Sequence, residues 1–420
     1  MLNLTSGMQR LINKALIFLK EEELIFMKKV LAINSGSSSF KYKLFSLPDE
    51  KVLAKGMADR VGLEDSSFEI KLADGTKHVE KTEIPDQEAA VSLLIKFLKG
   101  YHVVEELTEI VGVGHRVVNG GEYFKDSTII TKENLPKIYE LSDYAPLHNP
   151  AEARGIEAFM NVLPNVPEVA VFDTTYHRNL DPVHYLYSLP YEYYEKYGVR
   201  KYGAHGTSIR YTAPRAAKLL GKDLKDLKLV ICHLGSGASI TAVKDGKSYD
   251  TSMGFSPIAG ITMATRTGDI DPSLVQHLMK VEHKSMDEMI YIMNNKSGLL
   301  GLSGISPDMR DVRESDSERA KLARKIFINR IIRYVGAYIA EMGGVDAIIF
   351  TAGIGEHDTG VRKAVLDAFA YMGVVVDNEA NESVSEGLIT KTDSKVAGMV
   401  IPTNEELMIE RDVVRLTNID

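Results

Sequence analysis

The sequence is poor in cysteine, in long apolar runs and in excess positive charge. Its one cysteine, Cys232, cannot form an intrachain disulfide, which is typical of a reducing compartment and predicts a cytoplasmic protein. No apolar run approaches the roughly 20 residues that cross a bilayer, so we expect no membrane partner. The 50 Lys and Arg face 58 Asp and Glu, the formal net charge is −8, and no basic block offsets it. This balance argues against nucleic acid as the main partner.

The length and composition favour a globular protein. With 420 residues, 44% of them hydrophobic, we expect about two or three domains. Residues 1–26 are interpreted as an upstream extension, because Met27-Lys28-Lys29-Val30 has the pattern of a natural start before a strand. The apolar part of the extension, Ala15–Leu19, is too short for a signal-peptide core and is followed by acidic residues. We expect removal of residues 1–26 to leave solubility and activity intact.

A β-hairpin is predicted over Val30–Phe45, whose sequence is V-L-A-I-N-S-G-S-S-S-F-K-Y-K-L-F. An apolar run breaks into a Gly/Ser turn and resumes as an alternating strand. The N–H groups and hydroxyls of such a turn suit phosphate oxygens, and Lys41 just beyond it adds positive charge. An ordinary serine-rich turn is the alternative.

A second hairpin of the same kind is predicted over Val230–Val243, V-I-C-H-L-G-S-G-A-S-I-T-A-V, roughly 200 residues later. A third glycine turn follows an apolar strand at Ala347–Gly355. Two similar hairpins, each opening about half of the chain, indicate an internal duplication. The pattern favours a two-lobed α/β protein that binds a nucleotide.

Two charged residues stand at the ends of predicted strands, where open α/β sheets place ligand groups. Arg116 lies at the end of the apolar run 110–118, beside Gly120-Gly121. Asp173 ends the predicted strand 169–174. The alternative for Asp173 is a cap for the next helix.

Two further candidates lie in the second half of the chain. His205 precedes a helix predicted to run to Leu220, and an imidazole there can join the free helical N–H groups in binding an anion. Arg266 lies in the loop M-A-T-R-T-G-D-I-D-P. The acids of this loop could suggest a metal, but a helix that starts at Asp-Pro explains Asp271 without one.

The remaining segments give a coarse outline of secondary structure. Asp308–Arg310 is expected on a loop, and Gly353–His357 is expected to turn into a helix. The tyrosine-rich segment Tyr185–Tyr197 is expected to form a strand, a turn and a short helix. The other predicted elements are strands at 51–60 and 67–73 and helices at 87–98, from about 151, at 319–342 and at the C-terminus.

From Met27 onward the chain resembles the acetate kinase family of short-chain carboxylate kinases, within the acetate and sugar kinase, Hsp70 and actin fold. The motifs occur in the family's order: N-S-G-S-S-S-F-K-Y, G-H-R-V-V-x-G-G, A-P-L-H-N-P, F-D-T-T-Y-H, Y-G-x-H-G-T-S, C-H-L-G-S-G-A-S, D-T-S-M-G-F-S-P, T-R-T-G-D-I-D-P, F-T-A-G-I-G-E and P-T-N-E-E-L. The resemblance implies two duplicated ribonuclease H-like α/β domains around a central cleft, and a homodimer. The expected domains are 27–176 with the C-terminal helix 408–420, and 177–407.

The resemblance also implies roles for individual residues. The reaction centre would contain Arg116, Arg266, His205 and Asp173. The substrate pocket would be formed by Arg116, Val118, Leu147 and Pro257, and Mg²⁺ would bind at Asn34 and Glu405, with Mn²⁺ as a possible substitute. ATP or ADP would contact Lys41, Ser37, Ser39, His233, Leu234, Gly235, Ser236, Gly237, Asp308, Met309, Arg310, Gly353, Ile354, Gly355, Glu356 and His357.

Phosphoryl transfer from ATP to acetate is consistent with these residue types. A carboxylate with a pKa of roughly 4 is ionised at neutral pH and needs no strong general base. It needs in-line positioning and neutralisation of charge, which two arginines can provide. His205 would donate to the transferring group, and Asp173 would orient an arginine or the metal shell. Both hairpins and both arginines are expected to converge when the domains close.

Alternatives to acetate kinase activity remain open at this point. Propionate or butyrate could be the preferred acid, pyrophosphate could replace ATP, or the chain could be a non-enzymatic nucleotide-binding module. The sequence also departs from the family, which usually has His, Phe, His, Asn, Gly and Asn where this chain has Asn119, Ala204, Ile209, Ser236, Ala264 and His357. The missing ring at Ala204 could admit a longer acid such as propionate, or lower activity.

Overall fold

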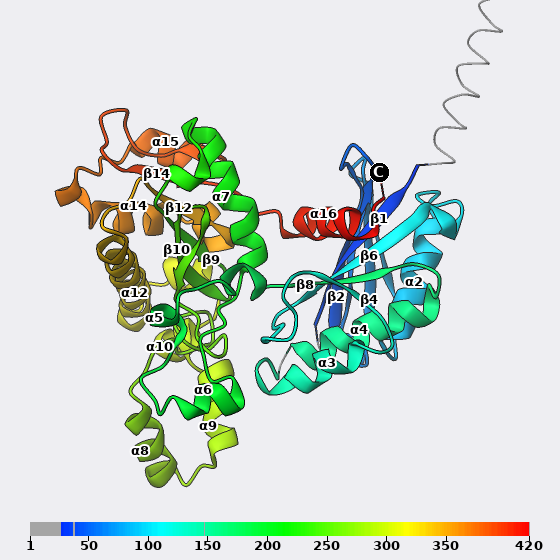
Figure 1. The fold of residues 1–420 in the computed structure, drawn as a ribbon, viewed down its shortest axis with the longest axis horizontal. Helices are drawn as coiled ribbons and strands as arrows, with labels where there is room; N and C mark the ends of the chain where they lie inside the picture. Colours follow the sequence, from blue (N-terminus) through cyan, green and yellow to red (C-terminus); the bar gives the residue numbers. More distant parts are fainter. Residues whose placement is uncertain (1–26, 37, 147, 420) are drawn as a thin grey trace, which may run out of the picture. The chain divides into compact units, whose positions relative to one another are not determined.

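The structure is a computed structural model that describes residues 27–36, 38–146 and 148–419. The predictions for residues 1–26, Ser37 and Leu147 lie outside the described residues. The chain divides into two compact units (Figure 1). In its described part, unit 1 comprises 27–117, 126–171 and 406–419, and unit 2 comprises 118–125 and 172–405. This division differs from the expected domain boundaries by assigning 118–125 and 172–176 to unit 2 and 406–407 to unit 1.

Unit 1 is built on an eight-stranded sheet in the order β5-β4-β3-β2-β1-β6-β8-β7. Its strands are β1 (Lys29–Ser35), β2 (Ser39–Ser46), β3 (Val52–Asp59), β4 (Ser67–Leu72), β5 (Lys77–Lys81), β6 (Ile110–Val117), β7 (Thr128–Ile130) and β8 (Glu168–Phe172). Its helices are α2 (Gln87–Gly100), α3 (Leu135–Glu140), α4 (Asn149–Val162), most of α16 (Glu405–Thr417) and the short 3₁₀ helices η1 (Leu107–Glu109) and η2 (Leu141–Asp143).

Helices cover both faces of the central strand β6. Val113 packs in one apolar core with residues of α2 and α4. Gly112 and Gly114 point to the opposite face, because side chains alternate along a strand. A Cβ on Gly112 would lie 2.4 Å from Val413, and one on Gly114 would lie 2.3 Å from Ile409. The two glycines therefore let α16 pack directly on the sheet.

Unit 2 contains a six-stranded sheet in the order β11-β10-β9-β12-β14-β13. Its strands are β9 (Leu229–Leu234), β10 (Ala238–Lys244), β11 (Lys247–Thr251), β12 (Ala347–Thr351), β13 (Gly387–Leu388) and β14 (Ala397–Val400). Alternation along β9 separates two cores: Val230 and Cys232 pack with α12 (Glu318–Met342), whereas Leu229 and Ile231 pack with α7 (Gly206–Leu220). The other helices are α5 (Pro182–Tyr185), α6 (Glu192–Tyr197), α8 (Pro272–Glu282), α9 (Met286–Asn295), α10 (Gly298–Ser303), α11 (Met309–Glu314), α13 (Ala352–His357), α14 (Thr359–Asp367), α15 (Asn378–Ser383), η3 (Thr175–His177), η4 (Leu224–Asp226) and η5 (Ala370–Met372).

The two sheets repeat one topology. In unit 1 the order β3-β2-β1-β6-β8 combines an antiparallel meander with a parallel β1–β6 pair. In unit 2 the order β11-β10-β9-β12-β14 combines an antiparallel meander with parallel β9–β12 and β12–β14 pairs. Both predicted hairpins are present, as β1–β2 and β9–β10. The predicted α/β class and the internal duplication are confirmed.

Three local predictions were wrong. Asp308 is the N-cap of α11, whose Arg310 N–H it accepts at 2.8 Å, so this segment begins a helix instead of forming a loop. Gly353–His357 is not an open glycine turn but lies within the six-residue helix α13, and the expected following helix is α14, which begins at Thr359. In the tyrosine-rich segment the expected strand is only an isolated bridge between Leu186 and Arg200, flanked by α5 and α6. Among the described residues, no helix combines the length and apolar character needed to cross a bilayer.

Candidate active site

The first hairpin places the predicted metal and phosphate residues of unit 1 together. Asn34 on β1 pairs directly with Lys41 on β2, and the Gly36 N–H donates to the carbonyl of Ser39 at 2.6 Å to close the tip. Gly155 of α4 lacks a Cβ that would lie 2.3 Å from the Ser35 hydroxyl. The hairpin tip is therefore held against α4 by a close backbone approach.

Arg116 is a half-buried residue near the end of β6. Its neighbour His115 is buried, and His115 Nε2 lies 2.6 Å from Glu168 Oε2 on β8. Burial lowers the pKa of His115 to about 3 and raises the pKa of Glu168 well above its usual range. Burial therefore favours the uncharged form of each group. Arg116 directly follows His115 in β6.

Two stacked histidines form the centre of the site in unit 2. The His205 and His233 rings lie 4.0 Å apart, between centroids, and are nearly parallel. Each ring is held through Nδ1: His205 by the Ser239 hydroxyl at 2.9 Å, and His233 by the Ser208 hydroxyl at 2.9 Å. The Nε2 atom of each ring is thereby left on the side of the glycine turn. His205 caps the N-terminus of α7 with φ +60°, as the sequence predicted for its position.

The Gly/Ser turn of the second hairpin faces His205 and Arg266. A Cβ built on Gly237 would lie 3.5 Å from His205 Nε2 and 3.5 Å from Arg266 Nη1. Arg266 Nη1 also donates to the carbonyl of Pro257 at 3.4 Å. The Ala264 N–H donates to the Ser236 carbonyl at 3.0 Å, which joins the arginine loop to the turn. The His205 imidazole and the Arg266 guanidinium thus both lie close to Gly237. A side chain on residue 237 would obstruct the surface beside them.

Asp173 is fully buried directly after β8. Its Oδ1 accepts from the Thr207 hydroxyl at 3.1 Å, and its carbonyl accepts from the Gly206 N–H at 2.9 Å. The alternative that Asp173 caps the next helix is wrong, because Thr174 occupies the cap position of η3. Asp173 is bonded instead to the first turn of α7, next to His205.

Most of the residues expected around adenosine line one cavity of about 520 Å³ in unit 2, and Gly355 and Glu356 are not part of its lining. This volume is within the range of small-molecule sites, roughly 300–1,000 Å³. Its wall contains Gly235, Ser236, Pro307, Asp308, Met309, Arg310, Arg313, Gly353, Ile354, His357 and Asp358. Gly235 and Ser236 of the second hairpin therefore form part of the wall of a cavity large enough for a nucleotide.

Two arginines organise the walls of this cavity. Arg310 bonds the Asp308 carboxylate at 2.6 Å and lowers the pKa of Asp308 to about 2. Arg362 is buried, and its Nη1 donates to the carbonyls of Gly355 at 3.1 Å and Glu356 at 2.6 Å. These bonds satisfy carbonyls of α13 that no further helical turn would reach. Sequence reasoning missed Arg362, since nothing in V-R-K-A signals a contact with α13.

A chain of hydrogen bonds connects His233 to the segment that leads into α16. Ser208 Oγ lies 2.9 Å from His233 Nδ1 and 2.8 Å from Thr403 Oγ1. The Thr403 N–H donates to Glu356 Oε1 at 3.2 Å. Ser208 and Thr403 were also missed by sequence reasoning, although both lie in recognised motifs, G-T-S and P-T-N-E.

The predicted metal residues have suitable chemistry. An amide oxygen from Asn34 and a carboxylate from Glu405, the first residue of α16, are the hard oxygen donors that Mg²⁺ prefers. The neighbouring Asn404 Oδ1 is buried and has no hydrogen-bond partner among the described residues. Each of these oxygen donors is of a type that suits the expected ion.

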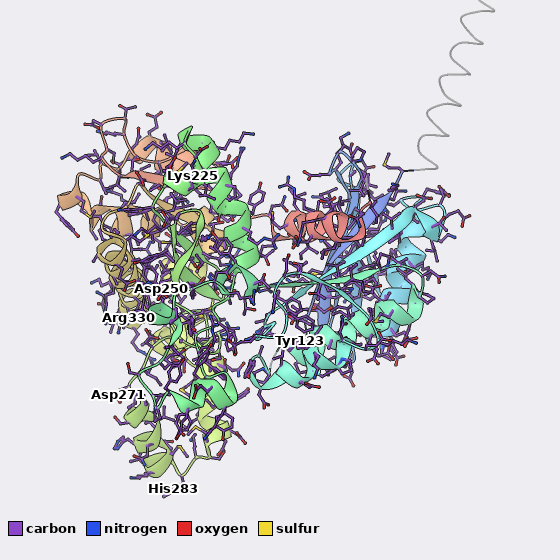
Figure 2. The ribbon with its side chains drawn as sticks, in the orientation of Figure 1. Tyr123, Lys225, Asp250, Asp271, His283 and Arg330 are labelled. Atoms are coloured by element: carbon purple, nitrogen blue, oxygen red, sulfur yellow. The ribbon has the colours of Figure 1, made fainter. Side chains whose placement is uncertain are left out.

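Other acidic groups of unit 2 have structural partners. Asp271 caps α8 (Figure 2) by accepting from the Ser273 N–H at 2.8 Å, as predicted. His184, Asp250 and Glu341 could offer three metal ligands within 4.8 Å of one another. The Lys201 ammonium lies 2.5 Å from Asp250 and already neutralises that carboxylate. Asp250, the central acid of the trio, is thus already paired with a cation.

The residues that depart from the family lie in ordered surroundings. Ile209 and Ala204 are buried in the apolar cores of unit 2, and the Ala204 carbonyl lies 2.9 Å from His177 Nε2. Asn119 Oδ1 accepts from the Gly121 N–H at 2.7 Å. Ser236 and His357 line the large cavity. The effect of these departures on activity stays a prediction.

Comparison of this chain with known proteins identifies its family. Residues 29–411 match the Acetokinase family. The chain is 54% identical over 398 residues to an acetate kinase of Bacillus thuringiensis subsp. konkukian, covering 94% of this chain and 100% of that one. It is 53% identical to an acetate kinase of Fructilactobacillus sanfranciscensis, with 93% and 100% covered.

Solved structures agree with the sequence relatives. An acetate kinase of Porphyromonas gingivalis superposes with a TM-score of 0.87 at 42% identity, covering 93% of this chain and 99% of that chain. A propionate kinase of Francisella tularensis superposes with a TM-score of 0.88 at 39% identity, covering 93% and 100%. The motifs, the duplicated topology and these matches lead to one conclusion: the chain belongs to the acetokinase family.

Proposed function

We propose that this protein catalyses the reversible, ATP-dependent phosphorylation of acetate to acetyl phosphate. The observation that carries the proposal is the convergence of His205 and Arg266 on the Gly235–Gly237 turn, whose Gly235 and Ser236 also line a nucleotide-sized cavity. The acetate kinases of Bacillus thuringiensis and Fructilactobacillus sanfranciscensis support the same acid substrate.

Each part of the reaction is assigned to residues of this chain. The carboxylate attacks the γ-phosphorus, and the bond from that phosphorus to the β–γ bridging oxygen of ATP breaks, so ADP leaves with the electron pair. Arg116 and Arg266 neutralise the two negative reactants and orient them. His205 donates through Nε2 to an oxygen of the transferring group. Asp173 orients the start of α7, and no proton has to be removed from the acid.

Binding is divided between the two units in this proposal. Unit 1 contributes Lys41 and Ser39, which contact phosphate oxygens, and Asn34. Unit 2 contributes His233–Gly237 for the β- and γ-phosphates and the walls of the large cavity for adenosine. Val118 and Pro257 contact the methyl group of acetate. A Mg²⁺ ion held by Asn34 and Glu405, or Mn²⁺ in its place, supplies charge neutralisation at the phosphate oxygens when it is bound.

Propionate is the second candidate substrate. Ala204 has little volume where the family usually has a ring, and the propionate kinase of Francisella tularensis is structurally similar to this chain. Acetate remains the preferred proposal because the relatives that share about half of the sequence are acetate kinases.

We further propose that the protein acts in the cytoplasm as a homodimer. Support for association comes from large apolar side chains exposed in unit 2, on α5, α8, α9 and the tyrosine-rich segment. They include Val183, Leu189, Tyr191, Tyr197, Leu274, Val281, Met286, Ile290 and Tyr291. Exposed apolar groups of this number favour burial against another protein surface.

Trapping of the product with hydroxylamine tests the proposed reaction. Folded protein supplied with Mg²⁺, ATP and acetate, propionate or butyrate should yield acyl hydroxamate, most rapidly with acetate. Replacing ATP by pyrophosphate should abolish the product. A preference for propionate would change the substrate, and the absence of hydroxamate with every acid would contradict the proposed enzyme activity.

A further inference from the structure

A second, much smaller cavity lies in unit 2, outside the residues assigned to the reaction. Its volume is about 120 Å³, which corresponds to about four water molecules. It is lined by Gly121, Glu122, Phe124, Thr174, Thr175, Arg178, Asn179, Arg200 and Tyr202. We call it the Arg178 cavity. A nucleotide cannot fit in this volume, and a single small ion can.

One of its two arginines is already fully engaged. Arg200 is 6% exposed, and its Nη1 pairs with Glu122 Oε1 at 3.1 Å. Its Nε donates to the Lys201 carbonyl at 3.2 Å, and its guanidinium lies 3.7 Å from the centroid of the Tyr185 ring. The Arg200 side chain is therefore held in place in the wall of the cavity. Its positive charge is largely balanced by Glu122.

The second arginine is different. Arg178 is half-buried, and among the described residues no side chain or carbonyl pairs with its guanidinium. Two guanidinium groups against one carboxylate leave the lining with a net charge of about +1. A partly buried cation without a counter-charge is unfavourable, because burial removes part of its hydration. A negatively charged ligand in this cavity would supply the counter-charge that Arg178 lacks.

The polar groups around Arg178 can complete such a site. The Thr174 hydroxyl accepts from the Gly120 N–H at 3.1 Å, and no described residue accepts its proton. Asn179, an exposed residue of the lining, carries an amide group that can also donate. Guanidinium, hydroxyl and amide donors are the set that binds tetrahedral oxyanions.

We propose that the Arg178 cavity binds one small tetrahedral oxyanion, free phosphate or sulfate, with Arg178 as its counter-charge. The proposal is independent of the acid that the enzyme phosphorylates. Thr174 and Thr175 directly follow Asp173, and Gly120 is bonded to Thr174. An anion in the cavity would therefore restrain the backbone beside Asp173 and stabilise unit 2.

Calorimetric titration of the full chain with sodium sulfate, at constant ionic strength in chloride, tests this site. Arg178→Gln should bind sulfate about tenfold or more weakly than wild type, since it loses a charged hydrogen-bond donor. Arg333→Gln is the matched control: it removes the same charge from an exposed position on α12 and should bind like wild type. Equal affinity in wild type and Arg178→Gln, or no binding by wild type at millimolar sulfate, would overturn the proposal.

Two further variants test whether sulfate binds in the Arg178 cavity or at the reaction centre. Arg266→Gln should retain sulfate binding in the Arg178 cavity; loss of all binding in that variant would assign the anion to the reaction centre. Glu122→Gln removes the carboxylate of the lining and should tighten sulfate binding several-fold. Unchanged or weaker binding by folded Glu122→Gln would contradict the proposal, and this test does not depend on the folding of Arg178→Gln.

Ligands of different size test whether the bound oxyanion is a free anion or part of a phosphate monoester. Inorganic phosphate should bind like sulfate, whereas glycerol phosphate, a phosphate monoester, should bind more weakly because its organic group exceeds the available volume. Equal or tighter binding of the monoester would overturn the assignment to a free anion. Binding is measured without turnover, so a failure of this inference is distinguishable from a failure of the proposed enzyme activity.

Discussion

The hairpins β1–β2 and β9–β10 have the same topology but different support at their tips. The β1–β2 tip is closed by a backbone bond from Gly36 to Ser39 and is braced by Gln87 Nε2, which donates to the Gly36 carbonyl at 3.3 Å. The β9–β10 tip faces His205, His233 and Arg266. Duplication has therefore kept the strand framework, while the side chains around each tip have become specialised.

This difference predicts separate roles for the two tips in binding and in the chemical step. The tip of unit 1 carries small hydroxyls, an amide and Lys41, which suit phosphate oxygens and a hard cation. The tip of unit 2 lies beside rigidly held imidazoles, which suit directed donation to a group in transfer. We therefore expect the two tips to contribute unequally to binding and to the chemical step.

The largest effect is expected from the two arginines. Arg116→Ala and Arg266→Ala should each lower turnover by roughly 10²–10⁴, comparable to the loss of a strong transition-state donor. Steady-state assays at saturating ATP and acetate measure this effect. Arg333→Ala, on the exposed side of α12, should keep wild-type turnover. Near-normal turnover in either site variant would remove that arginine from the mechanism.

A methyl group on each tip compares the two hairpins directly. Gly237→Ala should fold normally, because its Cβ would make ordinary contacts of 3.5 Å, but the methyl would lie between His205 and Arg266. We expect turnover to fall about 10–100-fold, since small displacements of reacting groups have such effects. Gly36→Ala, whose Cβ would lie 3.3 Å from Ser39 Oγ, should mainly raise KM for ATP. If Gly237→Ala and Gly36→Ala changed turnover and KM for ATP in the same way, the expected difference in role between the two tips would be contradicted.

Ser208→Ala tests the support of His233. Without the hydroxyl, His233 Nδ1 loses its partner at 2.9 Å, and the ring is free to change tautomer. We expect a decrease of about tenfold in turnover and an altered pH–rate profile, as for other residues that orient a functional histidine. Ser208→Thr retains the hydroxyl and should restore most of the activity. If Ser208→Ala only lowers thermal stability, Ser208 has a structural role.

The smallest effect on activity is expected from Glu410, a buried residue of α16 in unit 1. Burial and the nearby Glu50 raise the pKa of Glu410 to about 7. The folded state then holds a proton that the unfolded state releases above pH 4.5, so stability decreases as pH rises from about 5 to 8. Glu410→Gln should remove about 2–3 kcal/mol of this pH dependence, measured by denaturant unfolding, with little change in turnover. An unchanged pH dependence would contradict the shifted pKa.

The framework could be predicted from sequence because its signals are local. Apolar runs broken by Gly/Ser turns gave both hairpins, and His205 before the helix ending at Leu220 was placed correctly. Short helices were the main failure, since one turn, as in α13, contains too few residues to show a helical period.

The supporting contacts could not be predicted because they depend on the tertiary structure. Ser208 and Thr403 are 195 residues apart and touch only in the folded chain. Arg362 could not be assigned to the carbonyls of α13 from a helical pattern alone. Arg178 carries no signal in the sequence, since its importance comes from the cavity around it.

The central claim is that Arg116 of unit 1 and Arg266 of unit 2 act together in one phosphoryl transfer. A double-mutant cycle with Arg116→Lys, Arg266→Lys and the combined variant tests it, with kcat/KM measured by hydroxamate formation. Residues that act as a unit have non-additive effects, so the combined loss should be much smaller than the product of the two single losses. A combined loss equal to that product would show that the two arginines act independently and would contradict the claim.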